Sequence, residues 1–209
     1  MGQNRIMVAD KSIENSVFEE IEAHKIGKIY NSNDFSNVYA EESVRKAFQR
    51  LEKQGKIVRL GRGLYLYPRQ DPRLGTIYPS IAEIAEQIAR KEKLRIIPTG
   101  QQALLQLGLS TQVPMKSVYL TDGGPRNIQL GNRVLVFKPT TPKMLALKGK
   151  ISGPVVQALK TLGKDGIDNE IQNKLASLLD KENPIIAEAD ALLAPAWIRE
   201  IIMKLIKTK

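Results

Sequence analysis

The side chains best suited to binding chemistry lie in residues 40–54, whose pattern predicts an amphipathic helix. At about 100° per residue, one side of this helix is apolar and carries Val44, Ala47, Phe48 and Leu51. The opposite side and its flanks carry Glu42, Arg45, Lys46, Gln49, Arg50 and Lys53. These outward cations suit the phosphates along a DNA major groove. The alternative is a solvated helix face, because Lys and Arg are ordinary surface residues.

The basic character continues from this helix into a predicted hairpin. Between Arg45 and Arg73 nine side chains are basic and two are acidic, which gives a local net charge of +7. Arg62 lies between Gly61 and Gly63. Because these neighbours have no side chains, the Arg62 guanidinium can approach a phosphate or the minor groove. A plain turn with an exposed arginine is the other interpretation. The residues predicted to contact DNA are Ser43, Arg45, Lys46, Gln49, Arg50, Lys53, Arg59 and Arg62.

Two further stretches combine polar side chains with glycine turns, and they are Leu107–Pro114 and Tyr119–Pro125. The polar residues that they offer to a pocket are Ser110, Thr111, Gln112, Thr121 and Asp122. The competing interpretation is loop chemistry, because Asp-Gly and Gly-Pro are turn dipeptides.

Several kinds of catalytic and metal site are excluded by composition. The chain has no cysteine and one histidine, His24, so it cannot form disulfides, thiolate zinc sites or a histidine-rich metal site. It contains no glycine-rich phosphate loop. Asp165, Asp168 and Glu170 are close in sequence, but their context is that of helix capping. We therefore expect no catalytic residue, no metal and no cofactor, and we expect His24 to interact with the negative end of the first helix.

The elements of the first seventy residues follow the order of a winged helix-turn-helix. An apolar stripe at Ile13, Val17 and Ile21 predicts a first helix, followed by a short strand at 28–30 and a brief helix at 35–38. The helix at 40–54 and a hairpin at 56–68 complete the pattern. We assign 1–70 to this domain and interpret 69–75, which contains proline and glycine, as the linker.

Residues 76–209 are expected to form a second domain of mixed α and β structure. Capping boxes at Ser80/Glu83 and Thr99/Gln102 predict two helix starts. Strands are expected at 94–97 and 118–120, and a hairpin at 127–138. Helices are expected at 154–162, at 169–179 and after Pro195. The predicted fold class is thus α+β, with an N-terminal winged helix-turn-helix, then a mixed α/β domain with a helical C-terminus.

Composition indicates a globular protein, and its basic charge favours a polyanionic partner such as nucleic acid, although basic ribosomal proteins and ordinary soluble surfaces can carry the same charge. Of its 209 residues 42% are hydrophobic and 26% charged, and the net charge is +10. Met1–Lys11 has no apolar segment of signal-peptide length, and the apolar tail at 184–206 contains too many charges for a bilayer span. We expect a cytoplasmic protein without a membrane partner.

Ser43–Leu51 followed by Gly55–Tyr65, together with Leu107–Pro114 and Tyr119–Gly123, resembles the AbiE-type abortive-infection antitoxins and their relatives of unassigned function. The resemblance covers about residues 12–165. It implies an N-terminal winged helix that binds double-stranded operator DNA and represses its own operon. It also implies a C-terminal domain that neutralises a nucleotidyltransferase-like toxin, without forming a stable complex in the best-known systems.

The sequence therefore predicts a DNA-binding transcriptional autoregulator and antitoxin of an AbiE-like system, with no catalytic centre of its own. One alternative is a metal-dependent enzyme acting on nucleic acid through Asp122 and nearby carboxylates. A second alternative is an interaction module whose basic face binds RNA or an acidic protein.

Overall fold

The computed structural model describes residues 12–207 and divides the chain into two compact units, Met1–Gln87 and Ile88–Lys209. The fold mixes helices with antiparallel and mixed sheets, which confirms the predicted α+β class. Helix α3 (Ile81–Glu92) crosses the division, which thus falls later in the chain than residues 70–76. Met1–Lys11 lies outside the described residues. Between residues 12 and 207, no helix combines the length and apolarity needed to cross a membrane.

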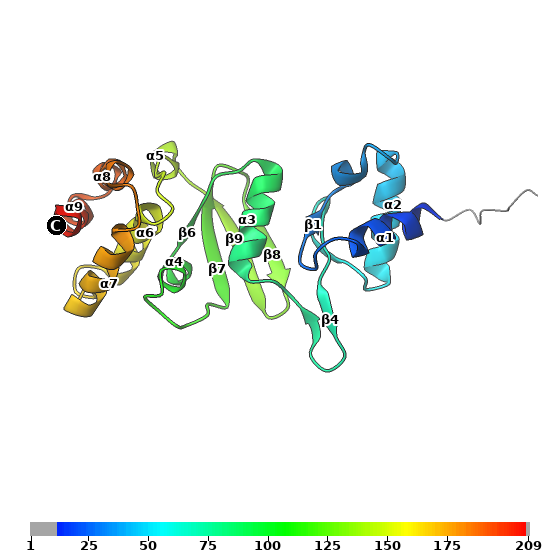
Figure 1. The fold of residues 1–209 in the computed structure, drawn as a ribbon, viewed down its shortest axis with the longest axis horizontal. Coiled ribbons are helices and arrows are strands. Elements are labelled where there is room, and N and C mark those ends of the chain that lie inside the picture. The colour runs from blue at the N-terminus through cyan, green and yellow to red at the C-terminus, as the bar shows by residue number, and fades with distance from the viewer. Residues whose placement is uncertain (1–11, 208–209) are drawn as a thin grey trace, which may run out of the picture. The chain divides into compact units, whose positions relative to one another are not determined.

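The first unit combines short helices with a small sheet (Figure 1). Its first helical elements are α1 (Ile13–Glu22), the 3-10 helix η1 (Ser32–Phe35) and α2 (Glu41–Lys53). The strands are β1 (Ile29–Tyr30), β2 (Val58–Gly61) and β3 (Leu64–Leu66). They form an antiparallel sheet in the order β1-β3-β2, so the chain from α1 to α2 is tied to the hairpin that follows α2.

An apolar cluster joins these helices to the sheet. Its fully buried side chains include Val17 and Ile21 of α1 and Leu51 of α2, which the sequence predicts. Ile13, the first residue of the predicted α1 stripe, is 42% exposed and lies outside the cluster. Aromatic rings continue the cluster, and the rings of Phe48 and Tyr65 lie 4.8 Å apart between centroids. Burial raises the pKa of Tyr30 to about 12, and its hydroxyl donates a 3.4 Å hydrogen bond to the carbonyl of Ile21. The buried side of α2 is therefore fixed against the sheet.

The segment interpreted as a linker is a second hairpin, formed by β4 (Arg69–Asp71) and β5 (Gly75–Ile77). The Asp71 carboxylate accepts hydrogen bonds from two backbone N–H groups of the turn, at 2.9 Å each. The interpretation of this segment as a loop was wrong. A polar, three-residue strand shows no hydrophobic period, whereas a local aspartate turn is enough to close the hairpin. Figure 1 shows this hairpin projecting from the helices of its unit.

The second unit is built on a four-stranded sheet in the order β6-β7-β9-β8. Its strands are β6 (Ile96–Thr99), β7 (Lys116–Thr121), β8 (Arg126–Leu130) and β9 (Arg133–Pro139). β7 and β9 run parallel at the centre, while each outer strand is antiparallel to its neighbour. The predicted hairpin about residues 131–132 is confirmed as β8–β9.

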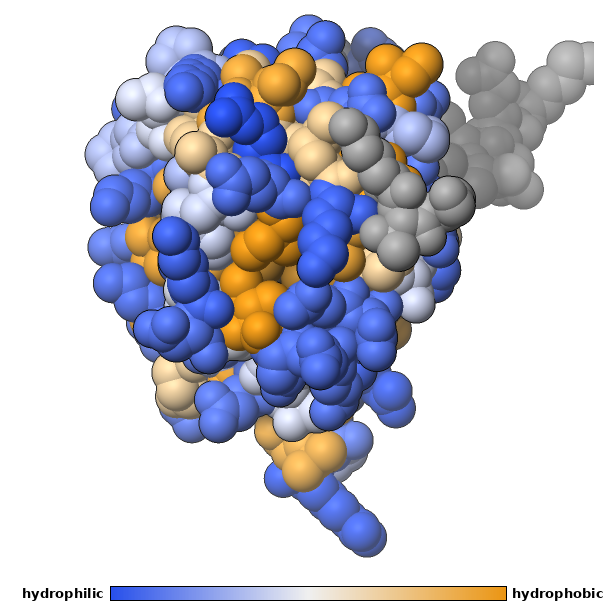
Figure 2. Space-filling view, turned by 90° about the vertical axis from the view of Figure 1, so that its left-hand side faces the viewer, coloured by the Kyte–Doolittle hydropathy of each residue, from blue (hydrophilic) through white to orange (hydrophobic). Residues whose placement is uncertain are grey.

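Helices make up the remainder of this unit. They are α4 (Gln101–Gln106), α5 (Pro142–Leu145), α6 (Ser152–Leu162), α7 (Asn169–Leu179), α8 (Pro184–Leu193) and α9 (Ala196–Lys207). Leu159, Leu175 and Ile198 join α6, α7 and α9 in one buried cluster. The sequence did not predict α8, which is apolar on most sides and lacks a clear stripe. Figure 2 shows apolar side chains at the centre of the outer face of these C-terminal helices, bordered by hydrophilic ones.

A buried acidic network holds the start of α6. Asp190 of α8 is 1% exposed, and it accepts hydrogen bonds from the Lys148 and Gly149 N–H groups at 2.8 and 2.9 Å and from Ser152 Oγ at 2.6 Å. Glu182 accepts two more backbone N–H groups at this helix start. A Cβ on Gly149 would lie 1.8 Å from Ser152 Oγ, so only glycine fits. The carboxylates satisfy amides that the helix leaves unpaired.

The two predicted capping boxes differ in outcome. Ser80 and Glu83 form the reciprocal bonds, with the Glu83 N–H to Ser80 Oγ distance at 3.2 Å and the return bond at 3.0 Å. Helix α4 is present, but the prediction that Thr99 caps it was wrong. Thr99 remains in β6 opposite Val118, and its hydroxyl donates to Gln157, so Gly100 takes the cap position.

Candidate nucleic-acid interface

Helix α2 presents the predicted basic side chains to solvent. Arg45, Lys46, Gln49, Arg50 and Lys53 are all exposed, while Ser43 is half-buried near the apolar side. Acidic residues occupy the first turn of the helix and cations the last turn, an order that the helix dipole favours. Because the apolar side of α2 is buried against the sheet, the basic side is the one that faces solvent.

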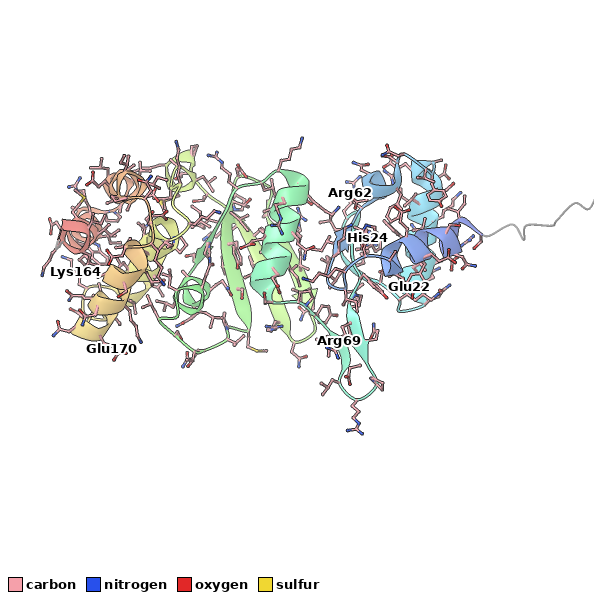
Figure 3. The ribbon with its side chains drawn as sticks, in the orientation of Figure 1. Glu22, His24, Arg62, Arg69, Lys164 and Glu170 are labelled. Atoms are coloured by element: carbon pink, nitrogen blue, oxygen red, sulfur yellow. The ribbon has the colours of Figure 1, made fainter. Side chains whose placement is uncertain are left out.

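A concave pocket of about 250 Å³ opens between α2 and the β2–β3 hairpin. Three guanidinium-bearing residues line it: Arg45 from α2, and Arg59 and Arg62 from the hairpin (Arg62 is labelled in Figure 3). The remaining lining residues are Ser32, Phe48, Gln49, Gly63 and Tyr65. We call these eight residues the basic pocket. Of the predicted contact residues, the structure brings Arg45, Gln49, Arg59 and Arg62 together here.

The other predicted residues lie outside the basic pocket. Lys46, Arg50 and Lys53 lie elsewhere on the exposed side of α2, and Ser43 does not line the pocket. Ser32 is the polar lining residue that sequence reasoning missed. It belongs to η1, and no helical or strand period relates it to α2, so only tertiary packing places it there.

Acidic neighbours neutralise part of the α2 surface. Arg45 pairs with Glu41 at 2.5 Å, Lys46 with Glu42 at 2.8 Å, and Arg50 with Glu14 at 3.6 Å. The hydrogen bond and charge of Lys46 lower the pKa of Glu42. Each of the three cations has a side chain 65% exposed, so these pairs are weak enough for a polyanion to displace.

The hairpin arginines differ, since neither Arg59 nor Arg62 forms an ion pair within residues 12–207. The Arg59 Nε–H donates to the Gly61 carbonyl at 3.3 Å, which orients its side chain along the hairpin. The positive charge of the basic pocket is thus least compensated on its hairpin side.

The two polar motifs of the second unit lie at opposite ends of β7. Ser110, Thr111 and Gln112 belong to the loop before this strand, and the Gln112 N–H donates to Ser110 Oγ at 3.1 Å. Thr121 is the last residue of β7, and its buried Oγ1 accepts from the Gly123 N–H at 3.0 Å. At about 3.3 Å per residue the strand separates the motifs by nearly 20 Å. They therefore do not line one pocket.

Asp122 is held by Arg95, the residue that precedes β6. Its carboxylate accepts the Arg95 backbone N–H at 2.9 Å and the Arg95 Nε–H at 3.2 Å. The backbone hydrogen bond is the main cause of the lowered pKa of Asp122, and the guanidinium adds to it. This carboxylate joins the ends of β6 and β7, which is a structural task.

The remaining candidate residues also have local partners. His24 Nδ1 lies 2.6 Å from the Glu20 carbonyl in the last turn of α1. Asp168 caps α7 by accepting the Ile171 N–H, and Glu170 pairs with Lys174 (Glu170 is labelled in Figure 3). Within residues 12–207, no three side chains of the His, Cys, Asp and Glu types gather as a metal site.

Comparison with known proteins identifies the family. The protein-family model described as "Family of unknown function (DUF6088)" matches residues 16–185, so the chain belongs to that family. No curated protein matches the chain. Among solved structures, the chain is similar to the crystal structure of the RV2827C protein from Mycobacterium tuberculosis. The two are 13% identical with a TM-score of 0.44, over 90% of this chain and 80% of that chain.

Proposed function

We propose that the first unit is a winged helix-turn-helix that binds duplex DNA. In this assignment α1, η1 and α2 are the three helices, α2 is the recognition helix and the β2–β3 hairpin is the wing. The order β1-β3-β2 supports it, because the strand between the first two helical elements pairs with the hairpin. Recognition helix and wing then face one duplex together.

The observation that carries the proposal is the basic pocket. Helix and hairpin each contribute arginines to one concave surface, and two of the three guanidinium groups have no acidic partner in the described part of the chain. Arginine binds phosphate oxygens through a fork of N–H donors. The wing arginines position the protein on the DNA backbone, and the exposed side of α2, including Gln49, meets the base edges.

We further propose that the protein is an autoregulator and antitoxin of an AbiE-like system. The support is the resemblance of Ser43–Tyr65 and of the motifs at 107–114 and 119–123 to those antitoxins. The partner would be a nucleotidyltransferase-like toxin encoded beside this protein. Co-expression with the neighbouring gene product tests the antitoxin proposal separately. Rescue of cells from the toxin would support it whether or not the proposed DNA contacts are correct.

Fluorescence anisotropy with a labelled duplex from the region upstream of the gene tests DNA binding. We expect binding to the duplex that weakens steeply with salt, with a logarithmic slope of about −0.9 for each phosphate neutralised. The double variant Arg59→Ala/Arg62→Ala should bind at least about tenfold more weakly. Lys164→Ala, which removes one exposed cation from the second unit, is the matched control (Lys164 is labelled in Figure 3).

Three results would contradict the proposal. Equal affinity of the double variant and the wild type would remove the basic pocket from the interface. Preference for single-stranded RNA over duplex DNA would favour the RNA-binding module. Metal-dependent cleavage of the probe would favour the alternative of a metal-dependent enzyme that acts on nucleic acid.

A further inference from the structure

A second cleft in the first unit, of about 440 Å³, is not used by the proposed DNA contacts. Its lining comes from the loop after α1, from Arg69 of β4, from the end of β5 and the segment that follows it, and from α3. The volume lies in the range of small-molecule sites. We call it the loop cleft, and its lining residues are Lys25, Ile26, Gly27, Lys28, Arg69, Ile77, Tyr78, Pro79, Glu83 and Gln87.

The walls of the loop cleft are held in place by hydrogen bonds. Gln87 Oε1 accepts the Ile29 N–H at 3.0 Å, and its Nε2 donates to the Gly27 carbonyl at 2.8 Å. On the same segment, the Gly27 N–H donates to the Tyr67 carbonyl at 2.7 Å. Gly27 has a φ of +89°, and a Cβ there would lie 3.1 Å from Pro79 Cγ, so the loop packs closely on the opposite wall. The cleft is thus preformed.

The surface inside is mainly apolar. Ile77, Tyr78 and Pro79 are half-buried, and Ile26 is 50% exposed although it borders the cleft. The amide of Gln87 is committed to the backbone on both its oxygen and its nitrogen. The walls therefore offer contact area for a flat apolar body and few groups that could recognise the polar edge of a nucleobase.

The charges at the rim are mainly positive, although the charge of Lys25 acts on Glu83 and Lys28 Nζ lies 5.0 Å from the centre of the Tyr30 ring. Lys25, Lys28 and Arg69 form no ion pair within residues 12–207. The single acid, Glu83, is engaged by the Ser80 N–H and hydroxyl, at 3.0 and 2.9 Å. Figure 3 shows Arg69 near the base of the β4–β5 hairpin. A guanidinium and an ammonium beside apolar walls match a carboxylate attached to an apolar body.

We propose that the loop cleft binds a small organic anion, an aromatic carboxylate, with its carboxylate on Arg69 and Lys28 and its ring against Ile77, Tyr78 and Pro79. This proposal does not depend on DNA binding, so it can be tested separately from the proposed function.

The test is a titration of the ¹⁵N-labelled full chain with 2-naphthoate, followed by amide chemical shifts. We expect saturable shifts centred on Gly27, Lys28, Ile77 and Gln87. The neutral analogue 2-naphthalenemethanol fills the same space without the charge, and it should bind at least about tenfold more weakly, because it loses the charge-assisted contacts with both Arg69 and Lys28.

Variants distinguish binding in the loop cleft from nonspecific binding elsewhere on the protein. Arg69→Gln and Lys28→Gln should each weaken 2-naphthoate binding about fivefold and leave the neutral analogue unchanged, while Lys164→Gln should change neither. The amide spectrum of each variant reports whether it remains folded. The proposal is overturned if 2-naphthoate causes no shift at these amides, if the neutral analogue binds equally well, or if the shifts centre on the C-terminal helices.

Discussion

The basic pocket and the acidic network at the start of α6 are both clusters of charged side chains, but they differ in what already occupies their hydrogen-bonding groups. In the pocket, Arg59 and Arg62 are exposed and without acidic partners in the described chain. In the network, Asp190 is buried and accepts hydrogen bonds from three donors of its own chain. A saturated buried charge organises the fold, whereas unsaturated exposed charges that converge on a hollow are free for a ligand.

The largest effect is expected from Asp190→Ala, which removes the central acceptor of the acidic network. The change leaves the buried Gly149 N–H and Ser152 hydroxyl and the part-buried Lys148 N–H without their acceptor, so we expect a loss of about 3 kcal/mol in the free energy of unfolding. Urea denaturation followed by the fluorescence of Trp197, the single tryptophan, measures it. Asp165→Ala removes an exposed carboxylate of the same unit and should cost less than about 0.5 kcal/mol. Equal losses would mean that the network is not needed for stability.

The next largest effect is expected from Arg62→Ala, measured by duplex binding. Affinity should fall about tenfold for related and unrelated duplexes alike, because phosphate contacts position the protein without reading sequence. Lys53→Ala removes an exposed cation of the same unit that does not line the basic pocket, and its effect should be about twofold. If only the specific duplex were affected, Arg62 would be a base reader.

Glu41→Gln should have the opposite effect on the basic pocket and strengthen DNA binding. Glu41 pairs with Arg45 at 2.5 Å and also accepts a hydrogen bond from Ser32, so its charge occupies part of the basic pocket. Removing that charge should raise the affinity for duplex DNA about threefold. Glu86→Gln changes the net charge equally at an exposed position of α3, and it should have a smaller effect. Identical gains would point to overall charge and not to the pocket.

The smallest effect concerns Asp122, a saturated carboxylate at the surface. Its pKa is lowered in the folded state, so its contribution to stability is complete above the ordinary value of 3.8 and is lost as the pH falls through the folded pKa. Asp122→Asn should therefore lower the Tm slightly at pH 7, and the difference from wild type should shrink as the pH falls below 3.8. Thermal unfolding at several pH values checks this, and a difference that grows in acid would contradict it.

The sequence predicted those elements whose core is periodic. The stripe of α2 and the hairpin after it were located correctly, because apolar residues at helical spacing have only one side to bury. α8 and the β4–β5 hairpin were missed, since the first is apolar on most sides and the second is held by one aspartate turn. Thr99 matched a capping box in spacing, but strand pairing with Val118 took precedence.

The site was predictable only as a surface. Charge density indicated which side of α2 faces solvent, yet it could not show that Arg45 and Gln49 meet Arg59 and Arg62 while Lys46 and Lys53 do not. That selection depends on how the β2–β3 hairpin packs against α2. The motifs at 107–114 and 119–123 are close in sequence, but the length of β7 keeps them apart.

The strand order of the second unit also sets the sequence in which its sheet can be completed during synthesis. β8 and β9 are joined by two residues and can pair as soon as they are made, whereas β7 takes its central place only when β9 lies beside it. Until Pro139 has left the ribosome, the β6–β7 pair has one bare inner edge. The nascent chain therefore carries an unpaired strand edge over residues 116–121 for the time needed to add the next eighteen residues, a period in which chaperone binding would protect it.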